Sequence, residues 1–148
     1  MGTPEPDLLV LDASVLVELV VAGEHRAGAD ALLDRYEAAG GLVLISAAHG
    51  LIEATSAVRR MTQRGALDAE AGAQAAGWLS DLNLVLDATA PRLRRIWALR
   101  ERMTAYDAAY AATAEAYDAP LISIDRRLLG ACEMAEIAAA HLADLRAD

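Results

Sequence analysis

Lysine is absent from this chain of 148 residues, and its 13 basic side chains are all arginine. Enzymes that need a lysine to form a Schiff base or to grip a phosphate, as in a Walker A motif, are therefore excluded. Cys132 is the single cysteine, and His25, His49 and His141 are far apart in the sequence. Neither an internal disulfide nor a zinc site is expected, and a reducing compartment, the cytoplasm, is favoured.

Long apolar runs are lacking as well. The most apolar stretch near the start, Leu8 to Ala22, is interrupted by Asp12 and Glu18, and no basic segment precedes it. We therefore expect neither a secretion signal nor a membrane span. Acidic residues outnumber basic ones by 22 to 13, which gives a net charge of -9. This charge weighs against a polyanionic partner bound by long-range attraction alone.

Short β-forming apolar runs alternate with helical patterns along the chain. The expected strands are Leu8–Leu11, Leu42–Ile45, Leu84–Leu86 and Leu121–Ile124, with a weak fifth near Met134–Ala138. The expected helices are Ala13–Ala22, Glu24–Ala39, one after Ser46 that runs to about Arg64, Asp68–Asp81, Pro91–Met103, Thr104–Tyr117 and Arg126–Ala131. This alternation predicts an α/β fold with a parallel sheet of four to five strands between two layers of helices. Since no repeat or linker interrupts it, we expect residues 1–148 to form a single domain.

Two aspartates directly follow expected strands. Asp12 comes after the first strand and Asp125 after the fourth. Ligands of open α/β sheets bind beyond the carboxyl ends of the strands, so these carboxylates face each other if the two strands are neighbours. Each aspartate also precedes an expected helix, and helix capping is the alternative role.

Two further acids lie on expected helices. Asp107 follows Thr104 by three residues in a pattern that resembles a capping box, and Glu53 lies on the flank of an apolar arc, where a solvated position is the alternative. Gathered in one crevice, Asp12, Glu53, Asp107 and Asp125 would repel one another unless a cation neutralised them. Carboxylates without histidine or cysteine favour hard ions, so Mg²⁺ or Mn²⁺ is expected.

Several polar side chains near these acids are candidates for supporting roles. Ser14 and Ser123 are close enough in sequence to Asp12 and Asp125 to hydrogen-bond and orient these carboxylates, although Ser14 is equally suited to capping.

Three arginines are candidates for contacts with a phosphate, because the guanidinium fork matches phosphate oxygens. They are Arg100, which falls in an apolar arc, and Arg126 and Arg127, which follow Asp125. A solvated surface is the alternative for each. The aromatic and histidine side chains are instead expected in structural positions: Tyr106, Tyr110 and Tyr117, on one helical face, in the core or an interface, and His25, His49 and His141 in packing roles.

Three segments together resemble a known family. They are Leu9-Val10-Leu11-Asp12-Ala13-Ser14, Leu51-Ile52-Glu53-Ala54, and Thr104-Ala105-Tyr106-Asp107-Ala108-Ala109-Tyr110 followed by Ala119-Pro120-Leu121-Ile122-Ser123-Ile124-Asp125-Arg126-Arg127-Leu128. The sequence resembles the PIN-domain ribonucleases, and more narrowly the VapC toxins of type II toxin-antitoxin systems. Ser123 stands where the family commonly has threonine, a change that keeps the hydroxyl.

The resemblance implies a fold, a chemistry and partners. The fold would be the PIN-like three-layer α/β/α domain. Asp12, Glu53, Asp107 and Asp125 would be catalytic acids that bind one or two metal ions, and RNA would be hydrolysed by a metal-activated water. A VapB-like antitoxin and a second copy in a homodimer would be the protein partners.

Other functions remain open beside this one. The chain could be a PIN nuclease of RNA processing with no toxin role, or a catalytically silent PIN-like module that binds a partner. Silent modules usually lack the acids, which are all present here. Aspartyl-phosphate enzymes and receiver domains, the other acidic α/β crevices, resemble each other in requiring a lysine near the phosphate, which this chain lacks.

Overall fold

Five parallel strands form one sheet in the computed structural model, which describes residues 7–38 and 41–145. The strands are β1 (Asp7–Leu11), β2 (Leu42–Ala47), β3 (Leu84–Asp87), β4 (Leu121–Ser123) and β5 (Ala139–His141). Their order is β3-β2-β1-β4-β5, and β1 pairs with β4 through Val10 and Leu121. The expected α/β class is confirmed, and strands one and four are neighbours as expected. The chain therefore changes direction across the sheet between β1 and β4, which is where such folds bind ligands.

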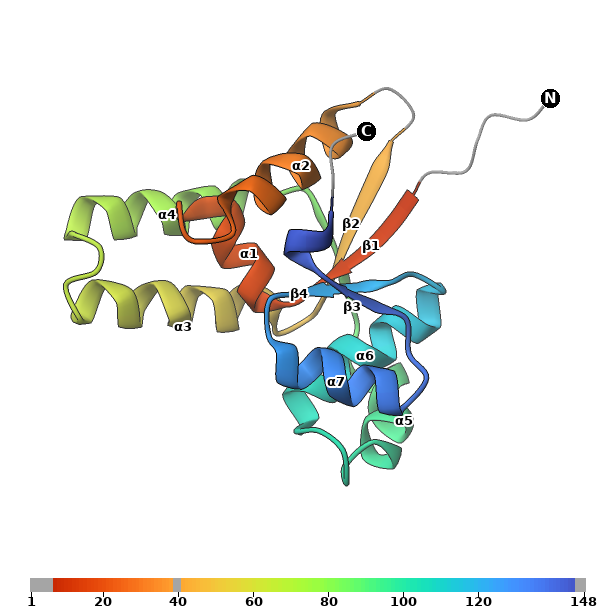
Figure 1. Cartoon of the computed structure of the whole chain (residues 1–148). Coiled ribbons are helices and arrows are strands. Elements are labelled where there is room, and N and C mark those ends of the chain that lie inside the picture. The colour runs from red at the N-terminus through yellow and green to blue at the C-terminus, as the bar shows by residue number, and fades with distance from the viewer. Residues whose placement is uncertain (1–6, 39–40, 146–148) are drawn as a thin grey trace.

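Helices cover both faces of the sheet (Figure 1). The first group packs on one face and consists of α1 (Ala13–Val20), α2 (Arg26–Glu37), α3 (Gly50–Gln63) and α4 (Ala69–Asp81). The second group lies on the other face and consists of α5 (Leu93–Ala98), α6 (Ala105–Tyr117) and α7 (Arg126–Met134). Two short 3-10 helices complete the described elements: η1 (Ala90–Arg92), which directly precedes α5, and η2 (Leu142–Asp144), which packs against α2. Helices α3 and α4 form a hairpin that projects away from the sheet (Figure 1).

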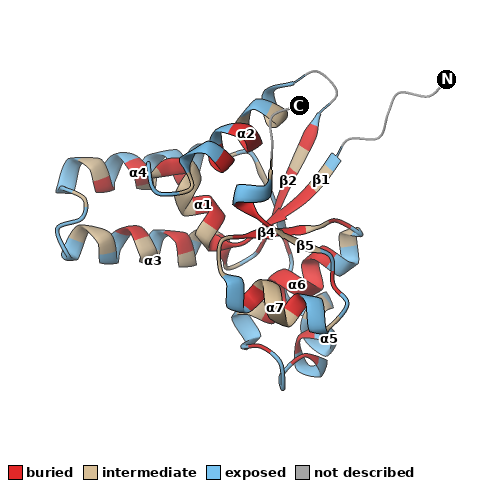
Figure 2. Cartoon of the chain, in the orientation of Figure 1, coloured by how far each residue is buried: buried red, intermediate tan, exposed pale blue. Residues whose placement is uncertain are grey.

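The core lies where the central strands meet the two helical layers (Figure 2). Val10 and Leu11 of β1 and Leu121 and Ile122 of β4 are buried, as expected for strands covered on both faces. The edge strand β3 is different, because Val85 and Leu86 are exposed there. No helix in residues 7–38 and 41–145 combines the length and apolar character needed to cross a membrane.

One expected helix is much shorter in the structure. The range Pro91–Met103 was expected to be continuous, but α5 ends at Ala98 and tight turns follow. The amide of Arg102 donates to the carbonyl of Leu99, and the amide of Arg100 donates to that of Trp97. These turns bury Leu99 and Met103 together and bring the chain to Thr104 in an extended conformation, ready to cap α6.

Two other boundaries differ from expectation. Strand β2 continues to Ala47, which pairs with Asp87, so α3 begins only at Gly50. The fifth strand begins at Ala139 and not near Met134, because α7 continues to Met134 and Glu136 then turns the chain with a left-handed φ of 59°. The expected end of the second helix at Ala39 lies outside the described residues.

Candidate active site

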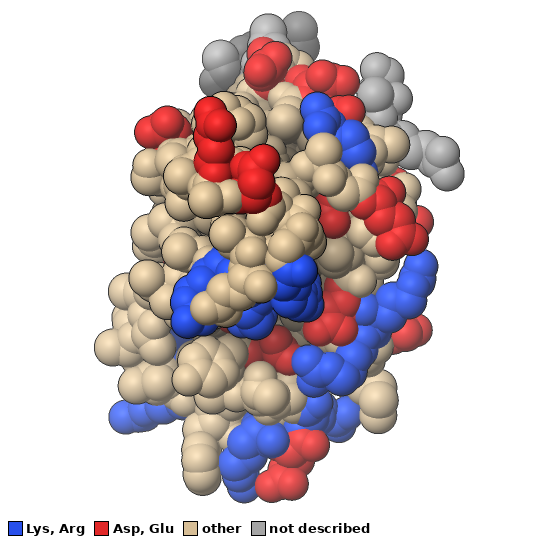
Figure 3. Space-filling model, turned by 90° about the vertical axis from the view of Figure 1, so that its left-hand side faces the viewer, with Lys and Arg blue, Asp and Glu red and all other residues tan. Residues whose placement is uncertain are grey.

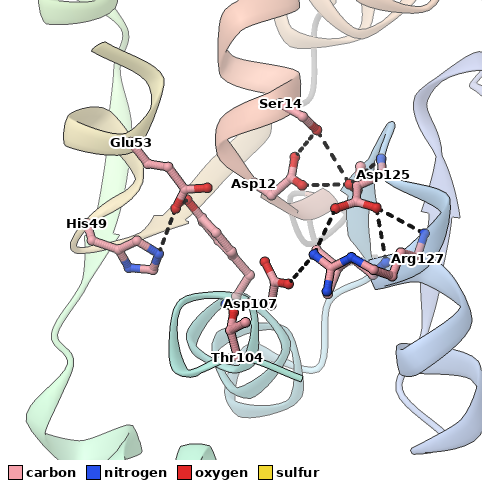
Figure 4. Close-up of polar contacts among 11 residues, drawn as sticks. Asp12, Ser14, His49, Glu53, Thr104, Asp107, Asp125 and Arg127 are labelled. Carbon is pink, nitrogen blue, oxygen red and sulfur yellow. Dashed lines mark hydrogen bonds and ion pairs between the residues drawn. The ribbon is translucent and has the colours of Figure 1, made fainter. Parts of the chain in front are cut away.

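Asp12 lies at the exit of β1 and is buried, with only 5% of its surface exposed. Its Oδ1 accepts hydrogen bonds from the Ser14 hydroxyl at 2.5 Å and the Val15 amide at 3.2 Å, and its Oδ2 accepts from the Ser123 hydroxyl at 2.6 Å (Figure 4). Burial raises the pKa of Asp12 above its ordinary value, and these hydrogen bonds oppose the rise only in part. The bond from Val15 shows that the expected capping role is real, since it satisfies an amide in the first turn of α1.

The two serines connect the exits of β1 and β4. Ser123 accepts a hydrogen bond from the Asp125 amide at 2.9 Å, and Ser14 accepts one from the Ile124 amide at 3.2 Å. Ser123 was expected to orient the Asp125 carboxylate, but in the structure both hydroxyls donate to Asp12. The effect is to fix the Asp12 carboxylate between two strands that are distant in the sequence.

Asp107 and Asp125 share one arginine. Nη2 of Arg127 lies 2.9 Å from Oδ2 of Asp107 and 3.4 Å from Oδ2 of Asp125 (Figure 4). Asp107 is in the first turn of α6, where Thr104 accepts a hydrogen bond from its amide, and Asp125 caps α7. The guanidinium therefore bridges two acids that come from different helix starts.

Glu53 faces the same crevice from α3 (Figure 4). Its Oε2 lies 3.3 Å from Nε2 of His49 and accepts a hydrogen bond from the Tyr110 hydroxyl at 3.3 Å. The adjacent His49 imidazole is the main cause that lowers the pKa of Glu53, and the Tyr110 hydroxyl adds to it. Glu53 is therefore ionised at neutral pH.

His49 and Tyr110 are contacts that sequence reasoning missed. The sequence predicts a packing role for His49, but it lies one helical turn before Glu53, a spacing that places two side chains on one face. Tyr110 is likewise one turn after Asp107 on α6. These two spacings were the available signal.

Other residues lie elsewhere than expected. Arg100 lies over the Trp97 ring at 4.7 Å and donates to the Trp97 carbonyl, so it is not in the crevice. Arg126 is exposed and, with Glu133 and His141, lines a different pocket; among the described residues its side chain forms no hydrogen bond or ion pair with the four acids. Tyr110 is buried as expected. Tyr106 is not in the core, because its side chain is exposed at the crevice edge, and an interface position for it stays a prediction.

Asp87 gives a useful comparison with Asp12. These two are the buried acids among the described residues. The Asp87 carboxylate accepts hydrogen bonds from Nε and Nη2 of Arg92, at 2.9 and 3.0 Å, and from the Thr113 hydroxyl at 2.9 Å. Its charge is thus neutralised inside the protein, whereas Asp12 is held by hydroxyls and an amide alone. A buried carboxylate without a cationic partner suits the binding of a cation from solution.

The four acids supply a donor set for a hard metal ion. Their carboxylates point toward a common space (Figure 4), and all their donor atoms are oxygens, which Mg²⁺ and Mn²⁺ prefer. Within residues 7–38 and 41–145, however, no three such side chains are close enough together to hold an ion. The Arg127 guanidinium occupies the position between two of them. The acids therefore fit a metal by the chemistry of their donor atoms, although Arg127 now pairs with Asp107 and Asp125.

Comparison with known proteins supports the same fold. The family model of the PIN domain matches residues 9–134. The ribonuclease VapC9 of Mycobacterium tuberculosis and a VapC ribonuclease of Mycobacterium bovis are each 37% identical over 76 residues, which is 51% of this chain and 60% of theirs. The match thus spans less than two thirds of the length of these relatives.

Solved structures extend the likeness to nearly the whole chain. PAE2754 from Pyrobaculum aerophilum superposes with a TM-score of 0.68 at 24% identity, covering 94% of this chain and 92% of that one. VapC20 of Mycobacterium tuberculosis, a toxin that cleaves the sarcin-ricin loop, gives 0.59 at 21% identity, covering 83% and 94%. At 24% and 21% sequence identity, these superpositions show a shared fold only.

Proposed function

The chain belongs to the PIN-domain family, and from this premise we propose that it is a metal-dependent endoribonuclease and the toxin of a VapBC-type pair. The observation that carries the proposal is Asp12, a buried carboxylate without a cationic side chain beside it, at the edge of the sheet in the crevice that three other carboxylates face. The mycobacterial relatives are named as ribonucleases, which supports a nuclease activity.

Mg²⁺ or Mn²⁺ would be held by the four acids Asp12, Glu53, Asp107 and Asp125. When bound, such an ion supplies a Lewis acid that lowers the pKa of a water and offsets negative charge on the phosphodiester. Ser14 and Ser123 keep the Asp12 carboxylate in one orientation by donating to both of its oxygens.

Arg127 has a second role in this proposal. Its guanidinium is exposed and carries fixed positive charge, so it can leave the acids and pair with a phosphate of the RNA at the mouth of the crevice. Arg100 and Arg126, whose side chains form no ion pair with the four acids among the described residues, are proposed as further RNA contacts.

The test is the substitution Asp12→Asn. We expect cleavage of single-stranded RNA in Mg²⁺ to fall by about 100-fold or more, because a metal ligand and its charge are lost. The variant should stay folded. Burial raises the pKa of Asp12 above the ordinary aspartate value of 3.8, so ionisation of Asp12 destabilises the folded state as pH rises above 3.8. The side-chain amide of asparagine is neutral and avoids this cost at pH 7.

Thermal unfolding in EDTA provides the control for this test. Asp12→Asn should melt at or above the temperature of the parent chain at pH 7, and Asp34→Asn, an exposed site on α2, should change neither cleavage nor melting. Full cleavage by a folded Asp12→Asn protein would refute the catalytic assignment.

The toxin role predicts a protein partner. Expression of the chain should arrest growth, and co-expression of a small antitoxin should relieve the arrest. One of the fold neighbours is VapBC2 of Rickettsia felis bound to a DNA fragment, with a TM-score of 0.64 at 14% identity, covering 90% of this chain and 98% of that one. This neighbour supports the search for such a partner. The homodimer also stays a prediction, and exposed Leu86 and Trp97 offer apolar surface for it.

A further inference from the structure

A cleft of about 410 Å³ opens directly beside the proposed catalytic acids. Glu53 and Asp107 form part of its lining, so whatever occupies the cleft lies next to the reacting phosphate. A volume of this size is within the range of small-ligand sites. Figure 3 shows basic side chains gathered around recessed acidic ones on the face toward which α3 and α4 project.

The cleft carries two large apolar side chains that the core does not use. Ile52 is 75% exposed and Tyr106 is 67% exposed, and they come from α3 and α6 respectively. The chain has only four tyrosines, two tryptophans and no phenylalanine, so an exposed tyrosine is a notable use of a scarce side chain. Both face the space beside the acids.

Tyr106 ends a row of rings that begins in the core. The buried ring of Tyr110 lies 4.7 Å from the His49 ring, and His49 lies 5.6 Å from the Tyr106 ring, measured between centroids. His49 is packed between the two tyrosines and holds Tyr106 from one side. The exposed surface of Tyr106 is therefore supported and free to receive one more planar group.

Positive charge borders the same cleft. Arg60 of α3 and Arg127 of α7 both line it, and Arg60 is positioned by its hydrogen bond to Ser56 at 3.1 Å. A planar group flanked by two anions matches this arrangement. A nucleotide within a single strand of RNA has that form, with a flat base between two phosphates.

We propose that this cleft is a subsite for one unpaired nucleobase of the RNA, covered by Tyr106 and Ile52, with the adjoining phosphate on Arg60. The inference rests on the proposed ribonuclease function and adds a position at which the enzyme holds its substrate. Stacking on an aromatic side chain tolerates different bases, so the subsite favours unpaired RNA over duplex.

The experiment uses a short single-stranded RNA whose cleavage position has been mapped with the parent chain in Mg²⁺. An abasic nucleotide is then placed in turn at each position around the cut. At one position, we expect kcat/KM to fall by roughly 5- to 100-fold for the parent chain, with the loss mainly in KM. Tyr106→Ala should show a similar loss with the intact RNA, Ile52→Ala a smaller one, and Tyr106→Phe should retain the parent value.

The decisive measurement combines the two changes. If the base stacks on Tyr106, the abasic RNA should lower kcat/KM of the Tyr106→Ala variant almost no further, because the variant has already lost this contact. Equal losses from the abasic RNA in both proteins would overturn the subsite, as would unchanged kinetics in Tyr106→Ala. Met134→Ala serves as the matched control, since Met134 is 72% exposed at the end of α7 and is not part of the cleft.

Two further outcomes are distinguishable. If the parent chain cleaves no RNA, the proposed function has failed and not only the subsite. If Tyr106→Ala keeps its RNA kinetics but no longer binds a basic antitoxin peptide, the cleft receives a protein side chain and the nucleobase proposal is wrong. Melting temperatures of all variants should match the parent, because both side chains are exposed.

Discussion

Arg127 places a permanent positive charge among carboxylates that are proposed to bind a metal. Its guanidinium reaches Asp107 at 2.9 Å and Asp125 at 3.4 Å, so it satisfies these acids in the absence of an ion. A divalent cation bound by Asp107 and Asp125 would have to displace the guanidinium, so the two cations would compete for the same oxygens. The outcome of the competition depends on ionic strength, because the arginine is exposed and its pairing is screened by salt.

Removing Arg127 should therefore raise metal affinity. We predict that Arg127→Ala binds Mn²⁺ and Mg²⁺ roughly two- to fivefold more tightly than the parent chain in calorimetry at low salt, because no guanidinium has to be displaced. Arg126→Ala is the matched control, since it removes the same charge from the neighbouring residue, whose side chain, among the described residues, forms no ion pair with the four acids. Equal affinities in Arg127→Ala and Arg126→Ala would show that Arg127 does not occupy the metal position.

Residue by residue, the sequence was most informative at the strand exits. Asp12 and Asp125 were found because a short apolar run followed by an acid marks the carboxyl end of a strand. The contact of His49 with Glu53 could have been found from the one-turn spacing of these residues, which places both side chains on one face. The placement of Tyr106 beside His49 could not, because it depends on a contact between residues far apart in the sequence.

Among the elements, α2 depends on a close approach that only glycine permits. A Cβ placed on Gly28 would lie 2.5 Å from the backbone carbonyl oxygen of Leu142 and 2.9 Å from the Leu142 side chain. This contact joins α2 to η2 near the end of the chain. Gly77 in α4 is the opposite case, since a Cβ there would meet nothing within 4 Å.

The two glycines should respond to alanine with opposite sign. We predict that Gly28→Ala lowers the free energy of unfolding by about 1–3 kcal/mol, because the backbone of η2 must shift to relieve the overlap. Gly77→Ala should raise it by about 0.5–1 kcal/mol, since alanine restricts the unfolded chain and favours the helix. Urea denaturation of both variants at pH 7 provides the measurement, and a stabilised Gly28→Ala would contradict the packing described here.

Sequence patterns located most elements but not all their ends. The strands were recovered because buried parallel strands are short apolar runs. The helix after Pro91 was predicted too long, since its residues are good helix formers and nothing local signals the turns that bury Leu99 and Met103. The fifth strand was placed too early for a similar reason, because the left-handed turn at Glu136 is a non-glycine position that no composition rule marks.

At the scale of the whole molecule, the net charge of -9 does not describe the face that RNA would meet. Arginines border the recessed acids on that face (Figure 3), so the field near the substrate differs from that of the chain as a whole. Metal binding would neutralise part of the acidic charge before RNA arrives. The surplus of negative charge would suit the proposed antitoxin, if its segment is basic, better than the proposed RNA substrate.

The two helical layers should unfold as one unit, as expected for a single domain. The chain has two tryptophans, and they report on opposite faces of the sheet: Trp78 lies on α4 and Trp97 on α5. The buried core contains Val58 and Leu79 from one layer and Ile96 and Tyr110 from the other in one cluster around the strands, so neither layer can lose its contacts without exposing the sheet.

We predict that Trp78→Phe and Trp97→Phe, each of which leaves one reporter, show fluorescence transitions in urea that coincide with the loss of helix by circular dichroism. Each variant has its own midpoint as the reference, because Trp78 is 49% exposed and Trp97 is 69% exposed, so the two replacements remove different amounts of packing. In each protein the fluorescence and dichroism midpoints should agree within error. A tryptophan transition that precedes the loss of helix would mean that its layer unfolds independently, and residues 1–148 would then contain more than one cooperative unit.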